Sequence, residues 1–307
     1  MSHNHTHSHD HHNHNVENIS TTRLFITMTL NFVITIAELI GGIISGSLSL
    51  ISDALHNFSD GIAIIISYIA IRLNKRPVNQ NFTFGFKRAE IIAAVFNASV
   101  LIGICLYLFI ESYHRFVSPE PIEGGLMIIV ASIGLLANVI GTLLLQKGAK
   151  ANINIRAAYL HLLSDAVSSV AVIIGGVFIY FYNIYWIDPV LTVLISLYII
   201  KASYSIVKEA TMVLMMAAPE NISIENIEKE ILDIEEISNI HHVHLWRVND
   251  KDVHFEAHIN VEDMMVSNTD IVLVKVEKLL NDKFDIEHVT LQFECNKCDN
   301  VELINNH

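Results

Sequence analysis

Residues 55–60 have the sequence Leu-His-Asn-Phe-Ser-Asp, and residues 160–165 repeat the pattern as Leu-His-Leu-Leu-Ser-Asp, each inside a strongly apolar stretch. In a helix, residues i and i+4 lie on one face, so His56 is placed beside Asp60 and His161 beside Asp165. If the two faces meet, they offer two imidazole nitrogens and two carboxylate oxygens to one ion. Such a set of four ligands suits a tetrahedral Zn²⁺ site.

A carboxylate at the centre of a membrane-spanning helix costs roughly 2.5–3.5 kcal/mol even on the most lenient insertion scale. Acidic residues in such segments therefore indicate a function. His56 and Asp60 could instead form a buried pair that only holds two helices together, and one copy of the motif would leave that alternative open. Two copies on separate apolar segments favour a site that carries a metal ion through a membrane.

The composition indicates a membrane protein with a soluble part. Of 307 residues, 52% are hydrophobic and 17% are charged, whereas soluble domains average about 25% charged residues. The net charge of −13 arises mainly after Pro219, which disfavours nucleic acid and suits cations. The three cysteines are too few for a disulfide framework, and the pair Cys295 and Cys298 is typical of reduced, metal-binding thiols.

Six apolar runs are long enough to cross a bilayer, which takes about 20 residues. We place them near residues 23–44, 48–71, 89–111, 122–145, 157–182 and 187–207. Lysine and arginine gather in the second and fourth connections, and the first and fifth contain neither. Since cytoplasmic loops carry the excess of these residues, we predict that both termini are cytoplasmic. The compact loops, and a start without signal-peptide features, favour a bacterial plasma (inner) membrane.

Polar residues within the spans are few and ordered. Asp53, His56, Asn57 and Asp60 follow one helical face, and Glu38 is an isolated polar point in the first span. A single polar stripe on an otherwise apolar helix indicates a bundle packed around a wet or metal-binding interior. Asp188 and Pro189 begin the sixth span, and Pro in a first turn indicates a helix-start device rather than a metal ligand.

The sequence thus divides into four parts. Residues 1–20 form a His-rich tail without core-forming residues, which we expect to be disordered and either to bind zinc weakly or only to aid solubility. Residues 21–210 form an all-α bundle of six transmembrane helices. Residues 219–295 form a small cytoplasmic α/β domain, and residues 296–307 form a C-terminal tail.

The α/β domain has the order αββαβ. We predict a helix over residues 224–232 capped by Ser223, strands over 240–248 and 253–261, a helix capped by Asn268 or Thr269 and running through Leu280, and a last strand over 286–293. Its histidines and one glutamate are candidate ligands. His254, Glu256 and His258 alternate onto one strand face, and His241, His242 and His244 lie on the neighbouring strand. The alternative is a solvated polar face on an edge strand.

The stretch from Ser47 to Gly61 resembles the second-helix signature of the cation diffusion facilitator family. The second motif at 161–165, the His-rich strand 241–246 and the last strand 287–294 are similar to that family as well. The resemblance implies a homodimeric antiporter that moves Zn²⁺ out of the cytoplasm against protons. It also implies that residues 219–295 are a ferredoxin-like cytoplasmic domain that binds zinc and helps to dimerise the chain. His56 in place of Asp resembles the zinc-preferring branch, and the connection over residues 79–86 lacks the ligands of an accessory site found in some relatives.

The resemblance also implies ligands in the cytoplasmic domain for a structural zinc ion. His241 and His258 fall where the family places metal ligands at the domain interface, and Asp270 and Glu294 could complete such a site. Relatives in the zinc-exporting branch also end in a cysteine pair, as Cys295 and Cys298 do here.

We expect a secondary transporter that exports Zn²⁺, with Cd²⁺ and Co²⁺ as further candidate ions, in exchange for H⁺. Its transport ligands are His56, Asp60, His161 and Asp165. An intramembrane zinc enzyme is the first alternative, but four protein ligands would close the open position that catalytic zinc needs. A passive channel or a metal sensor is the second alternative.

Overall fold

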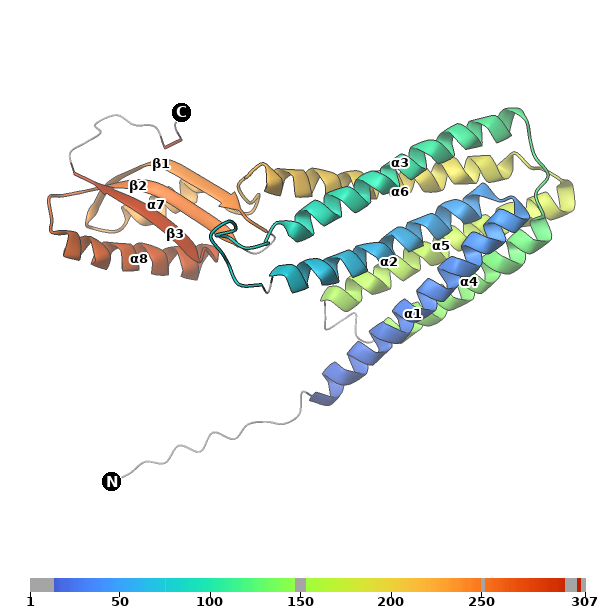
Figure 1. Cartoon of the computed structure of the whole chain (residues 1–307), viewed down its shortest axis with the longest axis horizontal. Helices are drawn as coiled ribbons and strands as arrows, with labels where there is room; N and C mark the ends of the chain where they lie inside the picture. The colour runs from blue at the N-terminus through green and yellow to red at the C-terminus, as the bar shows by residue number, and fades with distance from the viewer. Residues whose placement is uncertain (1–13, 75, 147–152, 250–251, 296–302, 305–307) are drawn as a thin grey trace, which may run out of the picture. The chain divides into compact units, whose positions relative to one another are not determined.

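The computed structural model describes residues 14–74, 76–146, 153–249, 252–295 and 303–304. The chain begins with long helices and ends in a small α/β domain (Figure 1). The long helices are α1 (His14–Ser45), α2 (Leu48–Asn74), α3 (Ala89–Val117), α4 (Gly124–Leu145), α5 (Ile153–Tyr182) and α6 (Ile187–Leu214). The domain consists of α7 (Ile224–Leu232), β1 (Ile237–Arg247), β2 (Val253–Val261), α8 (Val266–Phe284) and β3 (His288–Glu294).

The chain forms two compact units that are each built from more than one stretch of the sequence. The first unit holds the chain through Ile65 together with Asn97–Tyr204, and the second holds Ile66–Phe96 together with the chain from Ser205 onward. One cause is a small apolar cluster in which Ile91 of α3 packs with α6 residues Ala210 and Val213. These helix ends therefore belong to the second unit rather than to the bundle.

In the first unit, α4 packs against both α1 and α5, as Figure 1 shows. Leu101 and Cys105 of α3 pack against Ile199 of α6. Within the described residues, five helices are long and apolar enough to cross a membrane, namely α2, α3, α4, α6 and the Ala158–Tyr182 part of α5. The described apolar part of α1, Thr29–Ser45, is shorter. Five of the six predicted spans are thus present at full length.

The predicted disordered tail is too long at its C-terminal end. Helix α1 begins at His14, so residues 14–20 are helical, and residues 1–13 lie outside the described residues. The sequence contains neither Gly nor Pro between His14 and Gly41, so nothing in it stops the helix from extending toward the N-terminus. At its other end, Gly46 adopts φ +74°, the left-handed conformation that ends a helix.

Asp188, at the start of α6, also binds the N-terminus of α2. Its carboxylate is fully buried and accepts hydrogen bonds from the N-terminus of α2: from Leu48 N at 2.7 Å, Ser49 N at 3.2 Å, Ser47 Oγ at 2.7 Å and Ser49 Oγ at 2.5 Å. Backbone N–H groups in the first turn of a helix have no partner within that helix, and a carboxylate there also complements the helix dipole. Asp188 therefore anchors α2 to α6.

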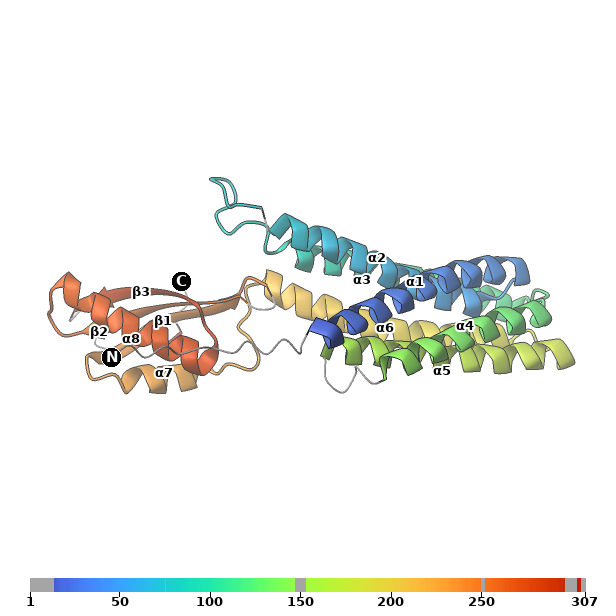
Figure 2. The ribbon, with the colours of Figure 1, turned by 90° about the horizontal axis from the view of Figure 1, so that it is seen from below.

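In the second unit, β1 and β2 are antiparallel, β2 and β3 are parallel, and α7 and α8 lie on the same side of the sheet (Figure 2). The core between helices and sheet includes Ile227, Phe255 and Val276. The predicted order αββαβ is confirmed, as is the Ser223 cap, whose hydroxyl accepts a hydrogen bond from Asn226 N at 3.2 Å.

The predicted start of α8 is wrong. The helix begins at Val266, with Met265 as its N-cap residue, instead of at Asn268 or Thr269. The Thr269 hydroxyl donates to the carbonyl of Val266 at 2.7 Å, so it bonds inside the first turn rather than capping it. A polar side chain that can cap a helix can also bond back within a helix that has already begun.

Candidate metal centres

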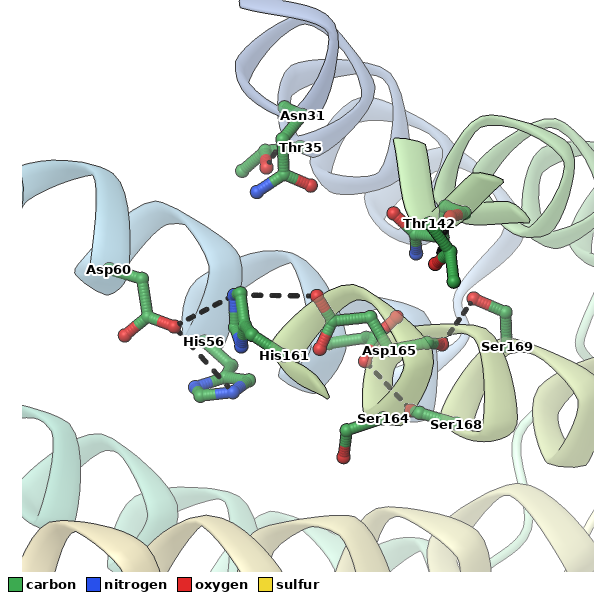
Figure 3. A network of polar contacts seen from close by, with 12 residues as sticks. Asn31, Thr35, His56, Asp60, Thr142, His161, Ser164, Asp165, Ser168 and Ser169 are labelled. Atoms are coloured by element: carbon green, nitrogen blue, oxygen red, sulfur yellow. Dashed lines mark hydrogen bonds and ion pairs between the residues drawn. The ribbon is translucent and has the colours of Figure 1, made fainter. Parts of the chain in front are cut away.

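The two repeated motifs meet in the first unit, where α2 carries His56 and Asp60 and α5 carries His161 and Asp165 (Figure 3). Asp60 Oδ2 lies 3.8 Å from His56 Nε2 and 3.3 Å from His161 Nε2. His161 Nε2 lies 3.4 Å from Asp165 Oδ2. One ligand atom from each of His56, His161 and Asp165 lies within 4.8 Å of the others. The structure thus gathers His56, His161 and Asp165 into one cluster, and Asp60 lies beside its two histidines.

These spacings match a metal site. Zinc bonds of about 2.0–2.2 Å in tetrahedral geometry place neighbouring ligand atoms about 3.3–3.6 Å apart. His56 Nδ1 and Asp165 Oδ2 are buried and have no hydrogen-bond partner among the described residues. A buried polar atom without a partner is costly, and a metal ion would satisfy the Asp165 oxygen. The donor set of two imidazoles and two carboxylates therefore fits a divalent cation such as Zn²⁺.

Polar contacts around the cluster fix the helices that carry it. Asp53, one turn before His56 on α2, accepts a hydrogen bond from Ser168 of α5 at 2.8 Å. On another side of α2, Ser59 Oγ donates to Asn97 Oδ1 of α3, and Asn97 Nδ2 donates back to the Ser59 carbonyl, both at 3.3 Å. These contacts set how α2 lies against α3 and α5, and thus where the motif residues point.

A second cluster lies in the C-terminal domain, where β1, β2 and β3 each contribute one ligand. Glu294 lies 3.4 Å from His241 Nε2 and 3.2 Å from His258 Nδ1. One ligand atom from each residue lies within 4.8 Å of the others, and His241 and Glu294 are buried. The spacing and the mixed nitrogen and oxygen donors fit a metal ion here as well.

Two features position His241. A bulge interrupts the pairing of β1 with β2 between His241 and His244, and His242 at the bulge has φ +53°. On the other side of the ring, His241 Nδ1 lies 3.2 Å from Asn239 Oδ1. If Nδ1 carries the hydrogen, Nε2 faces Glu294 as an unprotonated ligand atom, the usual arrangement around a metal-binding histidine. Neither the bulge nor the role of Asn239 was predicted from the sequence.

Of the other three predicted ligands of the C-terminal domain, two lie outside this cluster and one lies outside the described residues. Asp270 is exposed on α8 and is not part of the cluster around Glu294, because it lies in the first turns of a helix rather than on the sheet. Cys295 is exposed directly after β3, and Cys298 lies outside the described residues.

His254 of β2 lies apart from the cluster of His241, His258 and Glu294 and packs against another histidine. Its ring is buried and stacks on the ring of His288, with centroids 4.0 Å apart. Nearby, Lys87 Nζ lies 2.6 Å from Asp252 Oδ2. Burial, with His288 and Lys87 as further causes, lowers the pKa of His254. His254 is thus held neutral for packing and is not part of either ligand cluster.

Comparison with known proteins supports the fold and the class of function. The sequence profile of the cation efflux transmembrane domain matches residues 24–215, and that of the cation efflux protein cytoplasmic domain matches residues 219–295. The chain belongs to the cation efflux, or cation diffusion facilitator, family. It is a multi-pass membrane transporter for metal cations and not an enzyme.

Bacterial relatives match over most of their length. The chain is 37% identical over 277 residues to the metal cation efflux system protein CzcD of Cupriavidus metallidurans, covering 90% of this chain and 87% of that protein. It is 36% identical over 285 residues to the zinc transporter ZitB of Pectobacterium atrosepticum, covering 92% and 88%. It is 37% identical over 262 residues to the cadmium, cobalt and zinc/H(+)-K(+) antiporter of Bacillus subtilis, covering 84% of each.

Proposed function

We propose that this cation efflux protein exports Zn²⁺ from the cytoplasm in exchange for H⁺, by alternating access around the transmembrane ligand cluster. One observation carries the proposal. His56 and Asp60 of α2 meet His161 and Asp165 of α5, and the contacts of 3.3–3.8 Å are close to the edges of a tetrahedral site.

The donor atoms favour zinc and ions of similar chemistry. Two imidazole nitrogens with two carboxylate oxygens suit Zn²⁺, Co²⁺ and Cd²⁺, whereas a site made only of oxygens favours Mn²⁺ or Mg²⁺. Two carboxylates also balance the charge of a divalent ion in a medium of low dielectric constant. The names of the ZitB and Bacillus relatives, which specify zinc, cadmium and cobalt, support the same range of ions.

The chemistry of the ligands supports proton exchange. Zinc binds neutral histidine and ionised aspartate, so metal loading releases protons and protonation helps to eject the metal. Moving each positive charge outward against an inside-negative potential costs about 2.3 kcal/mol per 100 mV, which inward proton movement can offset. The Bacillus relative is named for antiport with H⁺ and K⁺.

The efflux family and the proposed topology together support export from the cytoplasm. Lysine and arginine concentrate in the second and fourth connections, which supports a multi-pass protein of the bacterial inner membrane with both termini in the cytoplasm. Residues 219–295 then form a cytoplasmic domain. There His241, His258 and Glu294 would hold a structural zinc ion, and the domain would join two copies of the chain.

Reconstitution tests the proposal. Purified protein is placed in vesicles, and Zn²⁺ uptake is followed with a zinc dye on one side while a pH dye reports proton movement. We expect zinc uptake with opposite proton flow in the unaltered chain. His161→Ala and Asp165→Ala should each abolish both signals, because a site with four ligands loses its geometry with any one of them.

Ser164→Ala is the matched control. Ser164 lies between the two α5 ligands in sequence, but its hydroxyl contacts Tyr198 OH at 2.8 Å rather than a candidate ligand. This variant should keep both signals. Near-normal flux in Asp165→Ala would refute the site, and zinc conductance without proton flow would favour a channel.

A further inference from the structure

Glu38 of α1 is a buried acid that the metal cluster does not use. Its side chain is 1% exposed, and neither carboxyl oxygen has a hydrogen-bond partner among the described residues. An ionised carboxylate without a partner in a medium of low dielectric constant is so costly that the group takes up a neutralising ion or a proton instead. Glu38 is therefore neutralised in this conformation.

The packing around Glu38 favours a proton over a metal ion. A Cβ built at Gly134 of α4 would overlap its carboxyl group, and Ile34 borders the same spot. The Asn57 amide of α2 is a polar neighbour, but it makes no hydrogen bond of normal geometry with the carboxyl group. A metal or potassium ion needs several oxygen ligands at bonding distance and the room to hold them. A proton needs no such shell.

Glu38 shares one face of α1 with two other polar residues. Asn31, Thr35 and Glu38 are spaced at i, i+4 and i+7 along α1, and the first two belong to the polar network of Figure 3. The acidic groups that interact electrostatically with Glu38 from the neighbouring helices are Asp53 of α2 and Asp165 of α5. From α4 it meets Gly134.

This arrangement couples Glu38 to the metal electrostatically. A divalent cation held by Asp165 and the two histidines brings positive charge within reach of Glu38 and favours loss of its proton. Departure of the metal leaves Asp53 and Asp165 as the acidic neighbours, which favours return of the proton. Such coupling is reciprocal, so protonation of Glu38 equally weakens metal binding.

We propose that Glu38 is a proton-exchanging residue of the transport cycle, separate from the four metal ligands. Its carboxyl group releases one proton when the metal loads and takes up one proton when the metal leaves. This inference rests on the proposed exchange of zinc for protons, and it assigns part of that exchange to a residue outside the motifs.

Two transport modes of the full chain in vesicles test the role of Glu38. Zinc-for-zinc exchange without a pH gradient requires only the metal site, whereas accumulation of zinc driven by a pH gradient requires proton coupling. Glu38→Gln should keep zinc exchange within about threefold of the unaltered chain but reduce gradient-driven accumulation at least about tenfold. Calorimetric titration with zinc in two buffers of different ionisation enthalpy should show about one fewer proton released per chain.

Two further variants separate acid chemistry from packing. Glu38→Asp keeps an acid and should retain gradient-driven accumulation. Glu111→Gln makes the same chemical change on α3, where Glu111 pairs with Arg115 at 3.0 Å, and should behave as the unaltered chain. Equal loss in Glu38→Asp and Glu38→Gln would overturn the proposal, because the effect would then follow the altered packing.

Other outcomes would also overturn the proposed proton-exchanging role of Glu38. If the Glu38→Gln variant keeps gradient-driven zinc accumulation, Glu38 does not carry the exchanged proton. If the variant loses zinc-for-zinc exchange, Glu38 is needed for zinc binding or passage instead. If the unaltered chain shows no gradient-driven accumulation and releases no proton on zinc binding, the proposed exchange itself fails. Potassium-driven accumulation that Glu38→Gln removes would assign the residue to potassium.

A measurement on the unaltered chain covers the case in which Glu38→Gln does not fold. An apolar carbodiimide reacts with protonated carboxyl groups in apolar surroundings, and mass spectrometry identifies the modified peptide. Glu38 should be labelled in metal-free protein and labelled less in the presence of zinc. Absence of the label, or equal labelling with and without zinc, would contradict the proposal.

Discussion

Replacing Asp188 should destabilise the bundle more than any exposed acidic residue does. In Asp188→Ala the hydroxyls of Ser47 and Ser49, which lie 3.1 Å apart, can turn toward each other. The backbone N–H groups of Leu48 and Ser49 cannot, and both residues are buried. Each buried donor left without a partner costs about 1–3 kcal/mol, so the two together cost about 2–6 kcal/mol.

A loss of about 4 kcal/mol in a unit of this size lowers the melting temperature by about 8–15 °C. The assay is thermal unfolding of the purified chain in detergent, followed by the monodisperse peak in size-exclusion chromatography. Asp188→Asn should show a smaller shift, because its amide oxygen still accepts from part of the α2 N-terminus. Asp282→Ala removes an exposed acid on α8 and serves as the control.

A double-mutant cycle makes the test specific to the contact. Ser49→Ala should destabilise the unaltered chain, because Ser49 donates to Asp188 at 2.5 Å, but should add little once Asp188 is alanine. A melting temperature for Asp188→Ala within about 2 °C of the unaltered chain would refute the anchoring role. So would additive effects of the two substitutions.

Two other predictions concern the ligands and the C-terminal domain. His56→Asp should shift transport away from Zn²⁺ toward harder ions such as Mn²⁺, because oxygen replaces nitrogen; unchanged selectivity in competition uptake would contradict the ligand role. The lowered pKa of His254 means that the folded chain binds the proton less well than the unfolded chain, whose histidine has a pKa of 6.5. The stability from neutral His254 is therefore present above that pH and is lost as the pH falls below it. His254→Gln should flatten the fall in melting temperature between about pH 7.5 and pH 5.5, and equal slopes would exclude this contribution.

Much of the fold could be predicted because its signals are local. Strand β2 has both predicted ends, Val253 and Val261, since alternating residues and a turn define them within a few positions. Helix α2 begins at the predicted Leu48, since Gly46 and Ser47 form the break before it. The two ligand motifs were visible because each is contained in a single helical turn.

What could not be predicted depends on contacts between distant residues. Asp188 caps a helix that begins 140 positions earlier in the chain, and no local pattern specifies that partner. The bulge at His242 decides that His241 lies opposite His258, whereas simple alternation would have given a different register. Asp270 was assigned to the metal cluster by resemblance alone, although the predicted helix already contained it, and in the structure it is exposed on α8 rather than on the sheet.

The transmembrane cluster depends on helix placement as much as on the motifs themselves. A shift of α2 by one residue along its axis is about 1.5 Å, which is large compared with contacts of 3.3 Å and 3.4 Å around His161. Asp188 anchors one end of α2, and Ser168 binds the turn just before the motif through Asp53. Residues that bind no metal thus determine whether two imidazoles and two carboxylates can reach one ion. If the transport cycle moves α2 relative to α5, the contacts of Asp188 and Ser168 must either break or move together with α2. Variants at Ser168 and Asp188 should therefore change the transport rate even though the four ligands are intact.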